Sequence, residues 1–142
     1  MCGIIIREFN LSDDYPGAFE LWKNSGAGIS VARSDSQNEI QKKLNYSPEL
    51  FLIAEMSGKL IGTVIGGFDG RRGMIYHLAV SKQFQKQGVG KMLMSEIESR
   101  LRSKGCLKSY LMVTKENTQV INYYQNMGWN VMDVCVMGKE LD

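Results

Sequence analysis

A short basic segment near the middle of the chain has the residue types that phosphate binding requires. The segment Ser81–Gly90 contains Gly88 and Gly90, and residues 81–95 include three lysines and no acidic residue. Glycines let a backbone approach a ligand closely, and a helix that begins here has unpaired N–H groups in its first turn. Helices usually place acidic residues in this turn, so their absence leaves the positive end of the helix dipole free. The segment therefore favours a bound phosphate.

The residues on both sides of this segment predict the elements that would position it. The apolar run Met74–Val80 precedes the segment and predicts a buried strand. Apolar residues follow it at spacings of three and four, which predicts one face of a helix: Val89, Met92, Leu93, Ile97 and Leu101. A strand, a glycine loop and a helix therefore follow one another, with the bare N–H groups at the start of the helix.

Length and composition restrict the class of protein. A chain of 142 residues with 44% hydrophobic and 23% charged residues is expected to form a single domain over residues 1–142. The net charge of +2 does not indicate a nucleic-acid binder, and no apolar run is long enough for a membrane span. Three scattered cysteines predict reduced thiols in a cytoplasmic protein, and one histidine does not favour a zinc site. We therefore expect no bound metal.

The hydrophobic periodicity predicts six strands and four helices in the order βααβββαβαβ. The strands are expected at residues 3–9, 50–56, 60–68, 74–80, 107–113 and 129–137. The helices are expected to begin at or after Ser12, Ser36, Gly88 and Asn117. Short turns make the second, third and fourth strands antiparallel neighbours, whereas a helical crossover makes the fifth strand parallel to the fourth. The paired glycines Gly66 and Gly67 indicate a bulge or a close approach by another element.

Two motifs then resemble a known family. Residues Gln85–Gly90 match a Gln/Arg-x-x-Gly-x-Gly/Ala loop, and Asn117–Trp129 match Asn, six residues, Tyr, three residues, Gly and an aromatic residue. With this strand order, the chain resembles the GNAT superfamily of acetyl-CoA-dependent N-acetyltransferases, and within it the small bacterial YpeA-type and RimI-like members. The resemblance implies a mixed α/β fold with a mostly antiparallel six-stranded sheet, in which one parallel pair is splayed around the cofactor.

The resemblance also implies the residues that would bind acetyl-CoA. Backbone amides of the loop and of the first helical turn would hold the pyrophosphate: Gln85, Lys86, Gln87, Gly88, Val89, Gly90, Lys91 and Met92. The pantetheine arm would pair with backbone groups of Leu78, Ala79 and Val80 in the gap between the splayed strands. Asn117 matches a residue that contacts the pantetheine region, although an asparagine here is equally suited to cap a helix.

The resemblance implies a catalytic acid in this chain but no clear catalytic base. Tyr124 matches the tyrosine that protonates the departing thiolate, but it shares a helix face with apolar residues and could be a core aromatic. Relatives carry a base at positions matching Met74 and Tyr76. Met74 cannot accept a proton, and Tyr76 is a candidate for ordering a water. Strand alternation places His77 on the opposite face from these two, which predicts a structural role.

The acceptor and the assembly remain open at this stage. The resemblance implies attack by an amine, either a small molecule or a protein N-terminus, in a groove bordered by residues 24–35 and 69–72. An alternative is a non-catalytic acyl-CoA-binding or regulatory domain, because Met74 cannot act as a base. A different acyl donor is a third interpretation. The protein is expected to be a monomer or a homodimer, with no nucleic-acid or membrane partner.

Overall fold

The structure is a computed structural model that describes residues 3–25 and 31–141. The chain divides into two compact units, Met1–Met112 and Val113–Asp142, and each is described by itself. The single domain expected over residues 1–142 stays a prediction.

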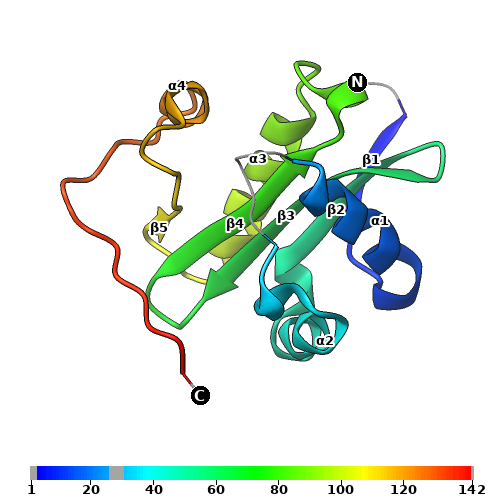
Figure 1. Cartoon of the computed structure of the whole chain (residues 1–142), viewed down its shortest axis with the longest axis horizontal. Coiled ribbons are helices and arrows are strands. Elements are labelled where there is room, and N and C mark those ends of the chain that lie inside the picture. The colour runs from blue at the N-terminus through cyan, green and yellow to red at the C-terminus, as the bar shows by residue number, and fades with distance from the viewer. Residues whose placement is uncertain (1–2, 26–30, 142) are drawn as a thin grey trace. The chain divides into compact units, whose positions relative to one another are not determined.

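The first unit contains a five-stranded sheet in the order β1-β2-β3-β4-β5 (Figure 1). Its strands are β1 Ile4–Glu8, β2 Phe51–Met56, β3 Lys59–Phe68, β4 Gly73–Val80 and β5 Ser109–Tyr110. The first four strands are antiparallel neighbours, and only β4 and β5 are parallel. The mixed α/β class and the single parallel pair predicted from the sequence are confirmed.

Three helices of the first unit cover the two faces of this sheet. They are α1 Leu11–Lys23, α2 Gln37–Tyr46 and α3 Val89–Ser103. Helices α1 and α2 lie on one face, and α3 lies behind the sheet on the other (Figure 1). The predicted cap Ser36 begins α2. The cap of α1 is Asn10, two residues before the predicted Ser12, because the Asn10 side chain accepts the Asp13 N–H. Either side chain can cap a helix, so the sequence alone did not discriminate between them.

The face under α1 and α2 holds a core of aromatic and branched residues. Trp22 is fully buried there and packs with Phe51, Ile65 and Ala79. Its indole Nε1 donates to Thr63 Oγ1 at 3.0 Å, so the one polar atom of this large side chain has a partner.

The opposite face of β3 accepts α3 at close range. A Cβ on Gly66 would lie 2.9 Å from Ile97 Cγ1, and one on Gly62 would lie 3.0 Å from Leu93 Cδ1. These glycines therefore let α3 approach the sheet, which is the close approach that Gly66 indicated in the sequence.

Strand β4 contains a bulge that the sequence analysis did not predict. Thr63 pairs with Ala79 and Ile65 pairs with Tyr76, so β4 uses one more residue than β3 over this stretch. His77 has a φ of +52° within the bulge. The extra residue breaks the alternation of side chains and turns the His77 ring toward α1, where it lies 4.8 Å from the Trp22 ring. The prediction that His77 faces away from Tyr76 was therefore wrong.

The predicted sixth strand is absent from the part of the chain that the structure describes. Residues 129–141 contain no strand, and the fifth strand is only Ser109–Tyr110 instead of residues 107–113. The alternating side chains of this segment are largely exposed, including Val134 and Val136. Alternation indicates which side chains could share a face, but a strand also needs a hydrogen-bonding neighbour, and the sequence does not specify one here.

The second unit contains the helix α4, Thr118–Gln125. Asn117 begins it as predicted, because its side chain accepts the N–H of Val120. Gly128 follows the helix with a φ of +95°, a conformation that favours glycine and ends the helical run.

Candidate active site

The parallel pair β4–β5 opens soon after it begins. Its register contains only Gly73 with Ser109 and Met74 with Tyr110. Within the described residues, β4 therefore has no strand partner on this side from Ile75 to Val80. Alternate backbone N–H and C=O groups of this stretch face the free edge, as an added strand or an extended ligand would require. The stretch includes Leu78, Ala79 and Val80, the residues expected to pair with a pantetheine arm.

The loop after β4 presents consecutive backbone donors. None of the six N–H groups of residues 86–91 donates to an acceptor among residues 3–25 and 31–141. Lys86 and Gly88 have positive φ angles of +63° and +85°, and Gly88 is the N-cap of α3 without a side-chain cap. Successive N–H groups in such a turn form a concave anion-binding site.

Side chains of the loop hold it in this shape rather than covering it. Gln85 Nε2 donates to the carbonyl oxygen of Val80 at 3.0 Å, and Gln87 Nε2 donates to that of Gln83 at 3.1 Å. The N–H of Met92 donates to Gly88 at 3.0 Å and is the first bond of the helix. The N–H of Gln85 likewise donates to the carbonyl oxygen of Lys82 at 3.5 Å. Of the amides expected to meet a pyrophosphate, those of Gln85 and Met92 are thus already engaged.

The charges around this helix start fit a diphosphate. The first turn of α3 has no acidic residue, and Lys82, Lys86 and Lys91 lie in the loop and in that turn. All donors in the set are N–H or ammonium groups, and no carboxylate competes for them within the loop. The chain's own residues therefore suit the phosphates of coenzyme A.

In the second unit, Tyr124 is surrounded by aromatic rings. Its ring lies 5.4 Å from that of Tyr123 and 6.2 Å from that of Trp129, and its carbonyl oxygen accepts the Trp129 N–H at 3.1 Å. Burial, and to a lesser extent Tyr123, raises the pKa of Tyr124 to about 12. The phenol therefore keeps its proton near neutral pH, as a proton donor must.

Tyr76 and His77 lie together on the face of the sheet that α1 covers. Their rings are 5.7 Å apart, and Tyr76 is 38% exposed. Burial and the charge of Asp35 raise the pKa of Tyr76, which makes it a poor base near neutrality. Met74 contributes no titratable group. The position expected for a base thus holds a tyrosine that stays protonated.

Asp35, which ends the segment 24–35 expected to border the acceptor groove, makes a contact with His77 that the sequence analysis did not predict. Its Oδ1 lies 2.7 Å from His77 Nε2, although the two residues are 42 positions apart in the chain. Asp35 is one of several polar residues in a stretch without periodicity, and no local pattern distinguishes it from a solvent-exposed acid. Only the bulge in β4, which the sequence does not reveal, brings His77 to it.

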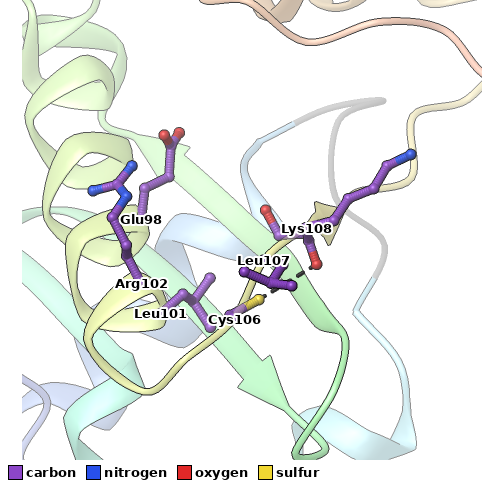
Figure 2. A pocket seen from close by; sticks show the side chains of 7 residues that line it. Glu98, Leu101, Arg102, Cys106, Leu107 and Lys108 are labelled. Atoms are coloured by element: carbon purple, nitrogen blue, oxygen red, sulfur yellow. Dashed lines mark hydrogen bonds between the residues drawn. The ribbon is translucent and has the colours of Figure 1, made fainter.

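A small pocket lies at the far end of α3. Figure 2 shows the side chains that line it, among them Glu98, Arg102 and Cys106, whose thiol donates to the carbonyl oxygen of Lys108 at 3.3 Å. Its volume of about 110 Å³ is below that of ordinary small-molecule sites. A helix of this length also separates it from the glycine loop by roughly 20 Å. It is not part of the candidate active site.

Two properties of the described residues bear on possible partners. Among the described residues, no three His, Cys, Asp or Glu side chains gather as a metal site would need. No helix within residues 3–25 and 31–141 combines the length and apolarity of a transmembrane span.

Solved structures share the arrangement of the chain. The crystal structure of PaiA N-acetyltransferase from Thermoplasma acidophilum in complex with coenzyme A has a TM-score of 0.78 and 24% identity, and the match covers 93% of this chain and 92% of that one. Ard1 from Thermoplasma volcanium has a TM-score of 0.79 and 24% identity, over 92% of this chain and 84% of that one. At these identities the likeness shows the fold, which is that of the GNAT acetyltransferases.

Sequence relatives then assign the family. The model of the Acetyltransferase (GNAT) family matches residues 12–129. An acetyltransferase of Pectobacterium atrosepticum is 37% identical over 136 residues, which cover 96% of this chain and 94% of that protein. An acetyltransferase of Yersinia enterocolitica is 38% identical over the same shares. The chain belongs to the GNAT family and is an acetyltransferase.

Proposed function

We propose that the protein transfers an acetyl group from acetyl-CoA to a primary amine, which attacks the thioester directly in a ternary complex. The observation that carries this proposal is the run of free N–H groups at residues 86–91, directly after a strand whose parallel ladder stops at Met74. A diphosphate and an extended arm attached to it would use these two features together. Coenzyme A has both parts in that order.

Each part of the cofactor has its proposed residues. The pyrophosphate is held by backbone amides of residues 86–91 and by the neighbouring lysines, while the Gln85 and Gln87 side chains keep the loop in shape. The pantetheine arm pairs with the free edge at Leu78–Val80. Asn117 acts first as the cap of α4, and a contact with the arm is a further proposed role.

Tyr124 is proposed to protonate the thiolate that leaves when the amine attacks. A thiol has a reference pKa of about 8.5, so a departing thiolate is stabilised by a nearby donor that is still protonated. The raised pKa of Tyr124, about 12, keeps this phenol in the donor form. Burial raises the pKa of any tyrosine, so a variant without the hydroxyl, rather than the pKa, distinguishes this role from that of a core aromatic.

The proposed acceptor is a small-molecule amine or a protein N-terminus. A lysine side chain with a pKa of about 10.4 is roughly one-thousandth neutral near pH 7.4, which costs about 4 kcal/mol. An α-amine with a pKa of about 7.7–8.0 costs less than about 1 kcal/mol. Amines of low pKa therefore place the smaller demand on a base. We further propose that the protein acts in the cytoplasm, where thiols such as Cys106 and Cys135, both free, stay reduced.

The experiment compares coenzyme A release between variants with a panel of named amines. The panel is spermidine, glucosamine, kanamycin, free amino acids and a peptide that begins with alanine. Tyr124→Phe is expected to lower the turnover of whichever amine reacts by about a hundredfold or more. Tyr123→Phe is the matched control, because it removes the neighbouring hydroxyl and is expected to keep the rate.

The panel also separates catalysis from binding alone. If coenzyme A binds but acetyl-CoA is not consumed with any amine, the protein is a non-catalytic acyl-CoA-binding domain, an interpretation that the methionine at position 74 leaves open. Equal rates in the wild type and in Tyr124→Phe would remove the role proposed for Tyr124. Propionyl-CoA in parallel reports on the choice of acyl donor.

A further inference from the structure

The only histidine of the chain forms a buried pair with a carboxylate. His77 Nε2 lies 2.7 Å from Asp35 Oδ1, and their side chains are 17% and 6% exposed. The Asp35 carboxylate also accepts the Ala32 N–H at 2.9 Å through Oδ2, so it is fixed from a second side. With Nε2 donating to Asp35, the lone pair of a neutral imidazole lies on Nδ1. Nδ1 has no hydrogen-bond partner within residues 3–25 and 31–141.

A chain of buried side chains holds His77 in its unusual conformation. Trp22 Nε1 donates to Thr63 Oγ1, and Thr63 Oγ1 donates to the carbonyl oxygen of His77 at 2.9 Å. The Trp22 ring meets the His77 ring edge-on at 4.8 Å. A positive φ at a residue other than glycine costs free energy and persists only where the surroundings impose it. This arrangement therefore fixes the imidazole more firmly than a surface loop would.

The bulge places His77 next to the strand residues that are proposed to bind the arm of the cofactor. Strand β4 leads into the glycine loop, and the proposed arm runs back along Leu78–Val80 from the phosphates. His77 is the next residue, about 10 Å along the strand from Val80. An arm that pairs with Leu78–Val80 would reach His77 next, and the thioester at its end would then lie near this residue.

We propose that His77 is the general base for the amine and that Asp35 is the residue that positions it; this inference rests on the proposed function. Nδ1 takes a proton from the acceptor ammonium, directly or through a water, and the N–H bond breaks to give a neutral amine. The imidazolium is stabilised by the Asp35 carboxylate. The amine then forms the new C–N bond, and the C–S bond of the thioester breaks.

The protons balance over this cycle. The sulfur takes a proton from Tyr124, and the proton that the nitrogen loses after attack restores Tyr124 through water. His77 releases its proton to solvent, which leaves amide, thiol and one free proton.

The groups that face the imidazole are Asp35, Tyr76 on the same strand, and from α1 the aromatic Trp22. The Tyr15 hydroxyl of α1 donates to the carbonyl oxygen of Asp35 at 2.9 Å.

A test without an acceptor uses the fact that the chain has one histidine. Its imidazole gives a single set of nuclear magnetic resonance signals, which are assigned by their loss in His77→Asn. Saturating acetyl-CoA is expected to shift these signals, whereas adenosine 3′,5′-bisphosphate, which lacks the arm, is expected to leave them unchanged. Asp35→Asn is expected to change the balance of the two tautomers in the free protein.

Kinetic variants test the role of the base. Asparagine tolerates the positive φ at position 77, so His77→Asn keeps the bulge and is expected to lower turnover by about 10²–10⁴-fold. Asp35→Asn is expected to lower kcat more than it raises KM, and imidazole is expected to restore rate to His77→Gly. Tyr46→Phe, at a tyrosine of α2 that is 76% exposed, is the control and is expected to keep the rate.

The outcomes separate this inference from the proposed function. Absence of coenzyme A binding in calorimetry would overturn both. Binding without a shift of the His77 signals would overturn the inference alone, whether or not any amine reacts. The same holds for a His77→Asn variant that turns over an amine at the wild-type rate.

Discussion

Tyr124 illustrates how the surroundings of one residue set its chemistry. An isolated phenol has a pKa near 10, and burial raises that of Tyr124 to about 12. The neutral form is the one that can donate a proton to sulfur. Activity that depends on this donor is therefore present below the raised pKa and is lost only as the pH rises through it.

This shift predicts the alkaline side of the pH profile. Between about pH 7 and about pH 10 the wild-type rate is expected to show no decline that is caused by Tyr124, because the phenol stays protonated there. The measurement is kcat against pH for the wild type and for Tyr124→Phe. A wild-type decline centred below about pH 10 that is lost in Tyr124→Phe would show that the group is more acidic than its surroundings imply.

The direction of the His77 side chain could not be predicted from the sequence. Its residue type is visible in the sequence, but its direction depends on one inserted residue in β4. A regular strand places successive side chains on opposite faces of the sheet, but a bulge interrupts this alternation locally. The partner Asp35 could not be found either, because the contact joins residues 42 positions apart.

At the scale of elements, the start of α3 combines a glycine in the left-handed region with free amides. Gly88→Ala would force an alanine into a φ of +85° with no other atom within 4 Å of its Cβ. We expect this variant to lose about 1 kcal/mol of unfolding free energy and to bind coenzyme A more weakly, because the amides depend on this backbone turn. Urea unfolding and calorimetry measure the two effects.

Gly105→Ala is the matched control at the other end of the same helix. Gly105 has a φ of +93° and likewise no atom within 4 Å of a Cβ. It is expected to lose a similar unfolding free energy and to keep the affinity for coenzyme A. Equal losses of affinity in the two variants would mean that stability, rather than the loop, determines binding.

The first pair of the β4–β5 ladder depends on a different glycine. A Cβ on Gly73 would lie 2.7 Å from Cys106 Sγ and 3.2 Å from Ser109 Cβ. Gly73→Ala is therefore expected to lower the unfolding free energy by about 1–3 kcal/mol in urea. The double variant Gly73→Ala with Cys106→Ala removes the closest clash and is expected to recover part of the loss. Additive losses in the double variant would contradict this packing explanation.

Most element boundaries could be predicted because their signals are local. The Ser36 and Asn117 caps and the short turns between strands lie within a few residues of the elements they define. The extent of β5 and the predicted strand at 129–137 depend on which backbone lies alongside, and that information is not local. The sequence therefore predicted the strand-loop-helix of the candidate site better than it predicted the edge of the sheet.

At the scale of the whole molecule, the two motifs of the family lie in different compact units. The glycine loop belongs to Met1–Met112, and Asn117 and Tyr124 belong to Val113–Asp142. Each unit carries its own part of the proposed chemistry, the free loop amides in one and the Tyr124 phenol in the other. The proposed reaction needs both, so the affinity for the cofactor and the rate of transfer are separate properties of the chain.

The central claim is that free amides at residues 86–91 bind the diphosphate of coenzyme A. Isothermal calorimetry of the full chain with coenzyme A tests it most directly. We predict saturable binding of one molecule per chain, with weaker binding in Gly88→Ala and unchanged binding in Gly105→Ala. No measurable heat at about 1 mM coenzyme A, with the protein shown to be folded, would contradict the account.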